Sequence, residues 1–266
     1  MAGDEGERPV VGQDRDGVVL TLTIDRPEAR NALNAAVLTQ LVDALTAATG
    51  DPTIRVVVLT GAGDRAFCAG ADLASGLTAD AGAVEQHEQR GLLRRLFDAT
   101  AALDKPLVGR INGHALAGGF GVALACDLLV AAEDAQFGTP EVRVGLWPFV
   151  ISALIVDHVG PKRALELMMT GQRLTAEQAR DWGFVNRVVP RAELDDAVAG
   201  LAAELVAGGP LAFALGRRAF HESRGMPPDR AMAYLHGMLD LAVQTEDVAE
   251  GITAFFGKRE PEWRGR

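Results

Sequence analysis

The stretch Ile111–Asp127, which reads INGHALAGGFGVALACD, decides the fold. It continues an apolar run that starts at Pro106, passes through small residues, and becomes an apolar helix-like segment over residues 120–126. Gly118 lies where that helix begins. The first amides of a helix have no intrahelical acceptor, and the helix dipole adds partial positive charge there. Since glycine lets a ligand approach the backbone closely, the stretch predicts either a site for an anionic oxygen at Gly118 or a turn needed only for packing.

A second turn of small residues favours the binding interpretation. Residues 54–60, IRVVVLT, form a continuous apolar run rich in β-branched side chains, which predicts a buried strand. The run leads into GAGDRAFCAGADL. The turns at Cys68–Asp72 and Ala117–Gly119 could each supply one backbone N–H group to the same carbonyl oxygen. Losing one donor of such a pair typically costs about 10²–10³ in rate.

The remaining pattern predicts layers of strands and helices. Residues 18–24 and 128–132 are typical of strands, and Asn34 is a candidate N-cap for a helix that ends at Gly50. A further helix is expected over residues 84–103. Later helices are expected over residues 161–170, 193–207, 211–222, 229–243 and 247–256, with a capping box at Thr175 and Gln178. An α/β core followed by a mostly helical end is the predicted organisation.

Composition limits the classes of function. The chain has 266 residues, 48% of them hydrophobic and 23% charged, which is ordinary for a globular protein. A net charge of −10 argues against nucleic acid as the main partner. No apolar run is long enough to span a membrane. The two cysteines offer no disulfide framework, so we expect a reducing, cytoplasmic setting without a membrane partner.

Three strings in order carry a resemblance to a known family. They are AFCAGADL, NGHALAGGFGVALACDLLVAAEDAQFGTPEVRVGL and MTGQRLTAEQARDWGFVNRVVP. With the C-terminal AFFGKREPEW, the chain resembles the crotonase family of enoyl-CoA hydratases and isomerases from about Val18 onwards. The resemblance implies an α/β fold, a spiral of ββα units with a helical C-terminal region that trimerises. It also implies a homotrimer or a dimer of trimers, and a coenzyme A thioester as the ligand, with no separate cofactor and no metal. We expect a flexible tail over residues 1–16, the spiral core over 17–200 and the helical region over 201–266.

The resemblance also implies the catalytic residues. Ala71 and Gly118 match the family's two backbone donors, and Glu141 matches its catalytic glutamate. Glu141 lies between Pro140 and an apolar run, where desolvation would raise its pKa and suit it to proton transfer, although it could be an ordinary acid at a helix start. Hydratases with two carboxylates carry the first at the position of Gly121. With one carboxylate, isomerisation is possible, and hydration needs water held by other groups. A non-catalytic acyl-CoA binder is the alternative.

Further positions match the family's substrate contacts. Ala29 and Arg30 correspond to a loop that contacts the nucleotide end of coenzyme A, and Lys258 corresponds to a lysine that reaches coenzyme A. Asp72 and Leu73 follow the first donor and are expected beside the substrate, although Asp72 could instead cap a helix. Gly121 is expected to leave space that the substrate occupies.

Three other features have simpler interpretations. Gly61-Ala62-Gly63 with Ala66 fits a dinucleotide fingerprint, but small loop residues follow where a helix would have to begin. Cys68 has no histidine near it in sequence, so we expect a buried, inert thiol. His114 is expected to form a structural hydrogen bond.

Overall fold

Pairs of strands followed by a helix make up the core of the protein. The computed structural model describes residues 9–72 and 83–266. Four successive units are built from β1 (Val11–Asp16), β2 (Val19–Ile24) and α1 (Ala35–Ala48); β3 (Val56–Gly61), β4 (Ala66–Cys68) and α3 (Ala83–Ala102); β5 (Leu107–Ile111), β6 (His114–Leu116) and α4 (Gly118–Leu124); and β7 (Leu128–Ala132), β8 (Gln136–Gly138) and α5 (Ser152–Thr170). Then follow β9 (Arg173–Thr175), α6 (Ala176–Asp181), β10 (Arg187–Val189) and α7 (Leu194–Ala207).

The strands form two sheets. The larger sheet has the order β1-β2-β3-β5-β7-β10 and the smaller one the order β4-β6-β8-β9. From β3 to β8, each unit therefore contributes its first strand to the larger sheet and its second strand to the smaller one. Within the smaller sheet β4, β6 and β8 are parallel, and β9 is antiparallel to β8. The carboxyl ends of β4, β6 and β8 consequently meet at one edge.

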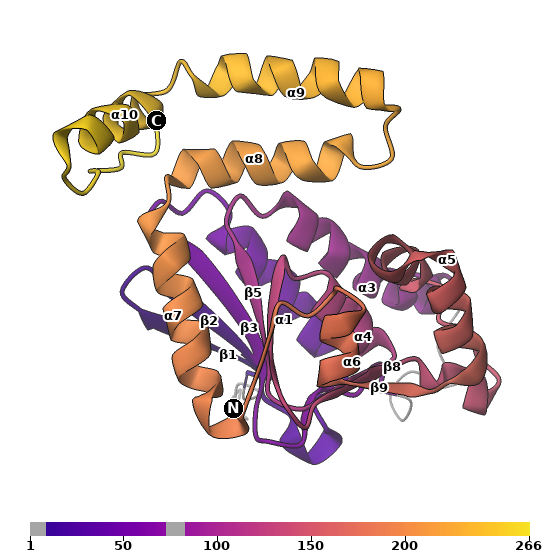
Figure 1. Ribbon diagram of the computed structural model, residues 1–266. Helices are drawn as coiled ribbons and strands as arrows, with labels where there is room; N and C mark the ends of the chain where they lie inside the picture. Colours follow the sequence, from indigo (N-terminus) through magenta and orange to yellow (C-terminus); the bar gives the residue numbers. More distant parts are fainter. Residues whose placement is uncertain (1–8, 73–82) are drawn as a thin grey trace, which may run out of the picture.

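Helices cover both faces of the larger sheet (Figure 1). Along β3, Val57 and Leu59 pack in the cluster that includes α1 and α4, whereas Val56 and Val58 pack against α7. Burial on both faces explains why this strand is a continuous apolar run. The predicted helix starts are confirmed at Asn34, whose Oδ1 accepts the Val37 N–H at 2.9 Å, and at the capping box of Thr175.

The N-terminal strand corrects one expectation. Residues 11–16, which we expected in a flexible tail, form β1 and pair antiparallel with β2. Val11 is buried, and its N–H donates to Gln40 Oε1 at 3.0 Å. The strand was missed because it is an edge strand with four exposed residues at its end, so VGQDRD lacks an apolar pattern.

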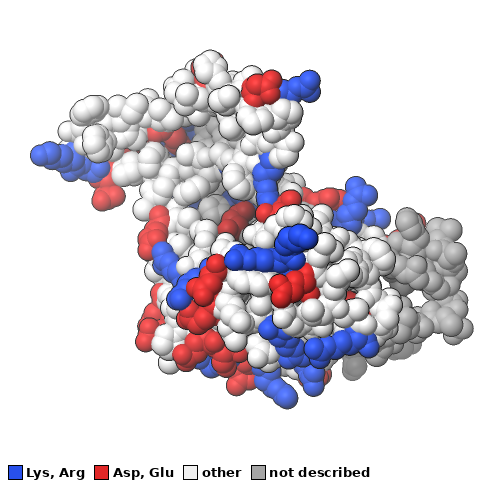
Figure 2. All heavy atoms as spheres, turned by 45° about the vertical axis from the view of Figure 1, so that its right-hand side comes forward, with Lys and Arg blue, Asp and Glu red and all other residues white. Residues whose placement is uncertain are grey.

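The C-terminal helices extend away from the core (Figure 1). They are α8 (Pro210–Ser223), α9 (Pro228–Ala242) and α10 (Glu246–Gly257), and α9 has no buried residue. The expected boundary at residue 201 falls inside α7, which packs on the sheet. Large apolar side chains are exposed along these helices, and charged atoms are sparse there at the top of Figure 2. Within the described residues no single helix could cross a membrane by length and composition, although α7 with its preceding turn and α8 pass together as a pair bent by 101°.

One arginine attaches α8 to the core. Arg217 Nε donates to both carboxylate oxygens of Asp127 at 2.8 and 2.9 Å, and Arg217 Nη2 donates to Thr100 O at 2.6 Å. Asp127 Oδ2 also accepts the Leu107 N–H at 2.8 Å. The Arg217 side chain is only 8% exposed. This ion pair therefore joins α8 to the end of α3 and to the start of β5.

Replacing Arg217 should destabilise the fold strongly. Arg217→Met leaves a largely buried carboxylate unpaired, and we expect a loss of about 3 kcal/mol in the free energy of unfolding, measured in urea. Arg218→Met is the matched control, because Arg218 pairs with Glu222 on the exposed surface and its loss should leave the stability close to that of wild type. Equal stabilities of the two variants would contradict this role.

The same ion pair has a definite pH dependence. Burial alone would raise the pKa of Asp127, but the interactions with His221 and Arg217 outweigh it, so the pKa lies below its ordinary value. His221 Nε2 is 3.6 Å from Asp127, longer than a hydrogen bond, so we ascribe most of the lowering to Arg217. A lowered pKa means that the stabilisation is present above the unfolded value of about 4 and is lost as the pH falls through the folded value. The difference between wild type and Arg217→Met should shrink accordingly in acid.

Candidate active site

Three neighbouring parallel strands end at the candidate site. Ala71 follows β4, Gly118 follows β6 and Glu141 follows β8, each within three residues of the strand end. The strands are held in register by pairing of Leu116 with Gly138 and by the Ala117 N–H, which donates to Gly138 O at 2.9 Å. Ligands of α/β proteins bind outside the carboxyl ends of parallel strands. The fold thus brings the three predicted catalytic residues to one edge.

The N–H of Ala71 is turned away from the neighbouring chain segment. Leu33 N–H donates to Gly70 O at 2.8 Å, and Asp72 N–H donates to Leu33 O at 2.9 Å. In this parallel bridge Ala71 is the residue between the two bonds, so its own N–H points to the opposite side. Gly70 has φ = +95°, which turns the chain immediately before the donor.

The N–H of Gly118 is turned outwards in a similar way. Gly118 is the first residue of α4, so it has no intrahelical acceptor. The preceding Ala117 has φ = 52° and ψ = −131°, a backbone conformation that usually costs an L-residue about 1–3 kcal/mol. A Cβ on Gly70 would lie 3.1 Å from Gly118 N, so the two turns are in contact. Within residues 9–72 and 83–266 neither the Ala71 nor the Gly118 N–H has a hydrogen-bond acceptor. Two adjacent free donors can hold one carbonyl oxygen.

Glu141 supplies a half-buried carboxylate at the third strand end. It is the second residue of the 3₁₀ helix η2 (Pro140–Val144), and its backbone carbonyl accepts the Leu146 N–H at 3.0 Å. Its Oε2 is buried and has no hydrogen-bond partner in the described part of the chain. Burial raises the pKa of Glu141, and a hydrogen bond from its own backbone offsets part of the rise. The direction predicted from the sequence is confirmed, and the group is suited to proton transfer.

This raised pKa predicts a gain in stability on substitution. A carboxyl group whose folded pKa exceeds its unfolded pKa makes the protein less stable as the pH rises through that interval. Glu141→Gln removes this penalty, so the variant should be more stable than wild type at pH 7. The gain should disappear at pH values below about 4, where both states are protonated. Urea unfolding of both proteins at pH 7 and below about pH 4 measures this gain. If Glu141→Gln were less stable than wild type at pH 7, the carboxyl group would not lie in an environment that raises its pKa.

The loop before α1 lies against the first donor turn. Ala29 ends the 3₁₀ helix η1 (Pro27–Ala29), and Arg30 is exposed with φ = 54°. Arg30 O accepts the Ala69 N–H at 3.1 Å, so this loop runs beside the donor turn. The Asp72 carboxylate forms an ion pair with Arg26 at 2.9 Å, which ties the two loops together. Leu73 lies outside the described residues.

Two buried asparagines that sequence reasoning missed support the β3–β4 turn. Asn31 Nδ2 donates to Ala66 O at 2.7 Å and to Ala62 O at 3.0 Å. Asn112 Nδ2 donates to Gly63 O at 2.7 Å, and Asn112 Oδ1 accepts the Gly61 N–H at 3.2 Å. Both side chains are 1% exposed. A single sequence gives no signal that an asparagine in a loop is buried.

Gly121 differs from the expectation, and Lys258 lies away from the strand ends of its own chain. A Cβ on Gly121 would lie 2.2 Å from Ile151 Cγ2 and 3.1 Å from Phe97 Cζ, so protein atoms fill the space that we expected to be open for substrate. Lys258 is the exposed C-cap of α10, at the far end of the molecule from α4 (Figure 1). The chain does not bring Lys258 to the strand ends, because α9 carries α10 away from the core.

The structure also tests the three simpler interpretations made from the sequence, those of Cys68, the Gly61–Gly63 turn and His114. Complete burial raises the pKa of Cys68 to about 12, in agreement with an inert thiol. After Gly63 the chain enters strand β4 at Ala66 and starts no helix, which argues against a dinucleotide turn. His114 Nδ1 is buried without a hydrogen-bond partner in the described residues, so the expected structural bond is absent at that nitrogen. Burial lowers the pKa of His114, and the charge of Arg173 adds to this effect.

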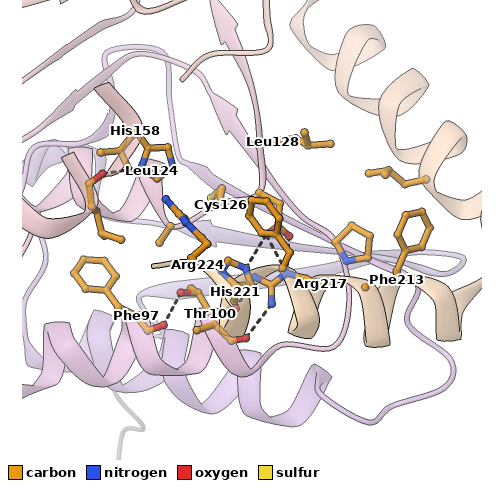
Figure 3. A pocket seen from close by; sticks show the side chains of 18 of the residues that line it. Phe97, Thr100, Leu124, Cys126, Leu128, His158, Phe213, Arg217, His221 and Arg224 are labelled. Carbon is orange, nitrogen blue, oxygen red and sulfur yellow. Dashed lines mark hydrogen bonds and ion pairs between the residues drawn. The ribbon is translucent and has the colours of Figure 1, made fainter. Parts of the chain in front are cut away.

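A cavity of about 670 Å³ lies at the other end of α4 (Figure 3). Its walls include the end of α4 together with α3, α5 and α8, through Leu124, Phe97, Leu154 and Phe220. Since Phe97 also faces Gly121, its ring lies between this cavity and the first turn of α4. The cavity is therefore separate from the three strand ends.

Comparison with known proteins agrees with this architecture. A family model described as enoyl-CoA hydratase/isomerase matches residues 14–266. The chain is 38% identical over 259 residues to the carnitinyl-CoA dehydratase of Salmonella paratyphi A, covering 95% of this chain and 97% of that protein. It is 37% identical over 247 residues to the crotonyl-CoA hydratase of Syntrophomonas wolfei, covering 92% and 94%. The crystal structure of enoyl-CoA hydratase from Bacillus anthracis matches with a TM-score of 0.91 and 31% identity, covering 97% of this chain and 100% of that one.

These matches establish the fold as the α/β crotonase fold with its C-terminal helices. The chain belongs to the enoyl-CoA hydratase/isomerase family, as its motifs predict.

Proposed function

We propose that the protein is an enzyme that acts on an acyl-CoA thioester through an enolate. The N–H groups of Ala71 and Gly118 hold the thioester oxygen, and Glu141 carries the proton that leaves or joins the carbon next to the carbonyl. The observation that supports this proposal is the meeting of two free backbone donors and one half-buried carboxylate at three adjacent strand ends.

The physical chemistry of the thioester suits these groups. When the α-carbon loses a proton, negative charge develops on the carbonyl oxygen. Donors that are fixed beforehand stabilise that charge without reorganisation, and the N-terminus of α4 adds its dipole. A carboxyl group with a raised pKa is better matched to proton transfer near neutral pH than an ordinary one.

The family relatives support a coenzyme A thioester as the substrate. Their names describe a carnitinyl-CoA dehydratase and a crotonyl-CoA hydratase. In our proposal the Ala29–Arg30 loop contacts the nucleotide end of the substrate, and coenzyme A enters as part of the substrate. The exposed apolar side chains of the C-terminal helices form the contacts of a homotrimer. Lys258 of one copy then reaches the coenzyme A bound to another copy.

An exchange experiment in heavy water tests this function. The protein is incubated with acyl-CoA thioesters that differ in chain length and double-bond position, and mass spectrometry separates deuterium uptake, water addition and no reaction. Uptake at the α-carbon that depends on Glu141 is the expected result. Binding without any reaction would instead support a non-catalytic acyl-CoA binder, the alternative that a glycine at position 121 favours.

A further inference from the structure

One face of α4 leads directly from the donor turn to Gly121. Gly118 and Gly121 are three residues apart and therefore lie on the same side of the helix. Helix α3 runs along this side: a Cβ on Gly118 would lie 3.7 Å from Leu93 Cδ2, and one on Gly121 would lie 3.1 Å from Phe97 Cζ. The position of Gly121 is thus one helical turn from the donor, facing α3.

Ile151 occupies the volume that a side chain at position 121 would need. Its Cγ2 and Cβ atoms would lie 2.2 and 2.9 Å from a Cβ on Gly121. Ile151 is 2% exposed and immediately precedes α5, where its carbonyl accepts the Ile155 N–H at 3.0 Å. Because its Cβ is bonded to the backbone, no change of rotamer removes the close contact. A carboxylate at position 121 and an isoleucine at position 151 exclude each other.

We propose that Ile151, which lies with Phe97 against position 121, is a specificity-determining residue that biases the site towards proton transfer without water addition. The inference rests on the proposed function. In hydratases with two carboxylates the position of Gly121 carries an acid; here that place holds a branched apolar side chain. A water molecule held inside a protein site needs two to four hydrogen-bonding partners. Ile151 and the Phe97 ring supply none, which leaves Glu141 as the proton carrier.

The reaction that this arrangement favours balances without water. From a 3-enoyl thioester, Glu141 removes a proton from C2, and the electron pair of the broken C–H bond passes into a dienolate whose charge rests on the thioester oxygen. The same carboxyl group returns the proton to C4. The double bond moves from C3–C4 to C2–C3, and Glu141 is a carboxylate again. Hydration of the product would require a water held beside C3.

A paired substitution tests the role of Ile151. Gly121→Glu with Ile151→Gly removes both close contacts and adds an acid one turn from the donor. We expect the rate of hydration of a short 2-enoyl-CoA to rise at least tenfold over wild type, in line with the roughly 10²–10⁴ that acid–base groups contribute. The loss of ultraviolet absorbance of the conjugated thioester measures this rate. The α-proton exchange rate in heavy water should change much less. The control Gly121→Gln with Ile151→Gly has the same size without the acid and should show no gain.

The outcomes separate this inference from the proposed function. If wild type shows no exchange with any thioester, the proposed function fails and this inference falls with it. If wild type exchanges and the folded Glu variant hydrates no faster than its Gln control, Ile151 is not the determinant. Should the double variant not fold, Ile151→Asp serves instead, with Ile151→Asn as its control, because both residues are favourable N-caps at the start of α5. The ratio of hydration to exchange should be at least threefold higher in the Asp variant than in the Asn variant, and equal ratios would overturn the proposal.

Discussion

Glu141→Gln is expected to lower acyl-CoA turnover by roughly 10²–10⁴, the usual contribution of a general acid–base group. Glutamine has nearly the same shape as glutamate but cannot accept the proton. Glu141 Oε2 has no hydrogen-bond partner in the described residues, and the amide oxygen of glutamine can still accept the hydrogen bond from the residue's own backbone. Steady-state kinetics on the thioester that exchanges fastest gives kcat/KM for both proteins.

A matched control separates loss of the proton carrier from a general effect of removing charge. Glu177 lies on α6 with a half-exposed side chain paired to Arg180, and Glu177→Gln should retain full activity. Turnover close to wild type in a folded Glu141→Gln protein would rule out the assigned role.

The pH dependence gives a second measurement on the same residue. The carboxylate form of Glu141 accepts the proton, so kcat/KM should fall as the pH drops through the pKa of Glu141 in the free enzyme. Because burial raises that pKa, the fall should occur at a higher pH than for an ordinary glutamate, whose pKa is about 4.3. The acidic limb should be absent from the residual activity of Glu141→Gln.

The parts of this structure that follow from local pattern were predictable from the sequence. Residues that are neighbours in the sequence determine three such features. They are the apolar run of β3, the cap at Asn34 and the glycines at the start of α4. Placing Ala71, Gly118 and Glu141 at one site needed the family resemblance, because no local rule specifies which strands are neighbours.

The features that were missed depend on distant residues. Ile151 is thirty positions from Gly121, and its packing could not be read from either segment. The edge strand β1 is recognisable only through its pairing with β2. Lys258 matches a family motif, but the direction in which α9 leaves the core decides where that lysine lies.

Ala71→Pro is expected to lower turnover by about 10²–10³, the usual cost of losing one donor to a developing oxyanion. Proline has no N–H group. The bridge to Leu33 uses Gly70 O and the Asp72 N–H, so removal of the Ala71 N–H deletes no structural hydrogen bond. Ala71 is also exposed, which leaves room for the ring.

Two variants distinguish loss of the donor from distortion of the loop. Ala71→Ser keeps the N–H and should retain activity within a few fold of wild type. Ala69→Pro removes an N–H that donates to Arg30 O at 3.1 Å, so it should lower stability, whereas Ala71→Pro should unfold near the wild-type urea concentration. The decisive comparison is kcat/KM of Ala71→Pro against Ala71→Ser at matched stability. Equal values would show that the Ala71 N–H does not hold the thioester oxygen, and the donor would then have to be sought elsewhere along the strand ends.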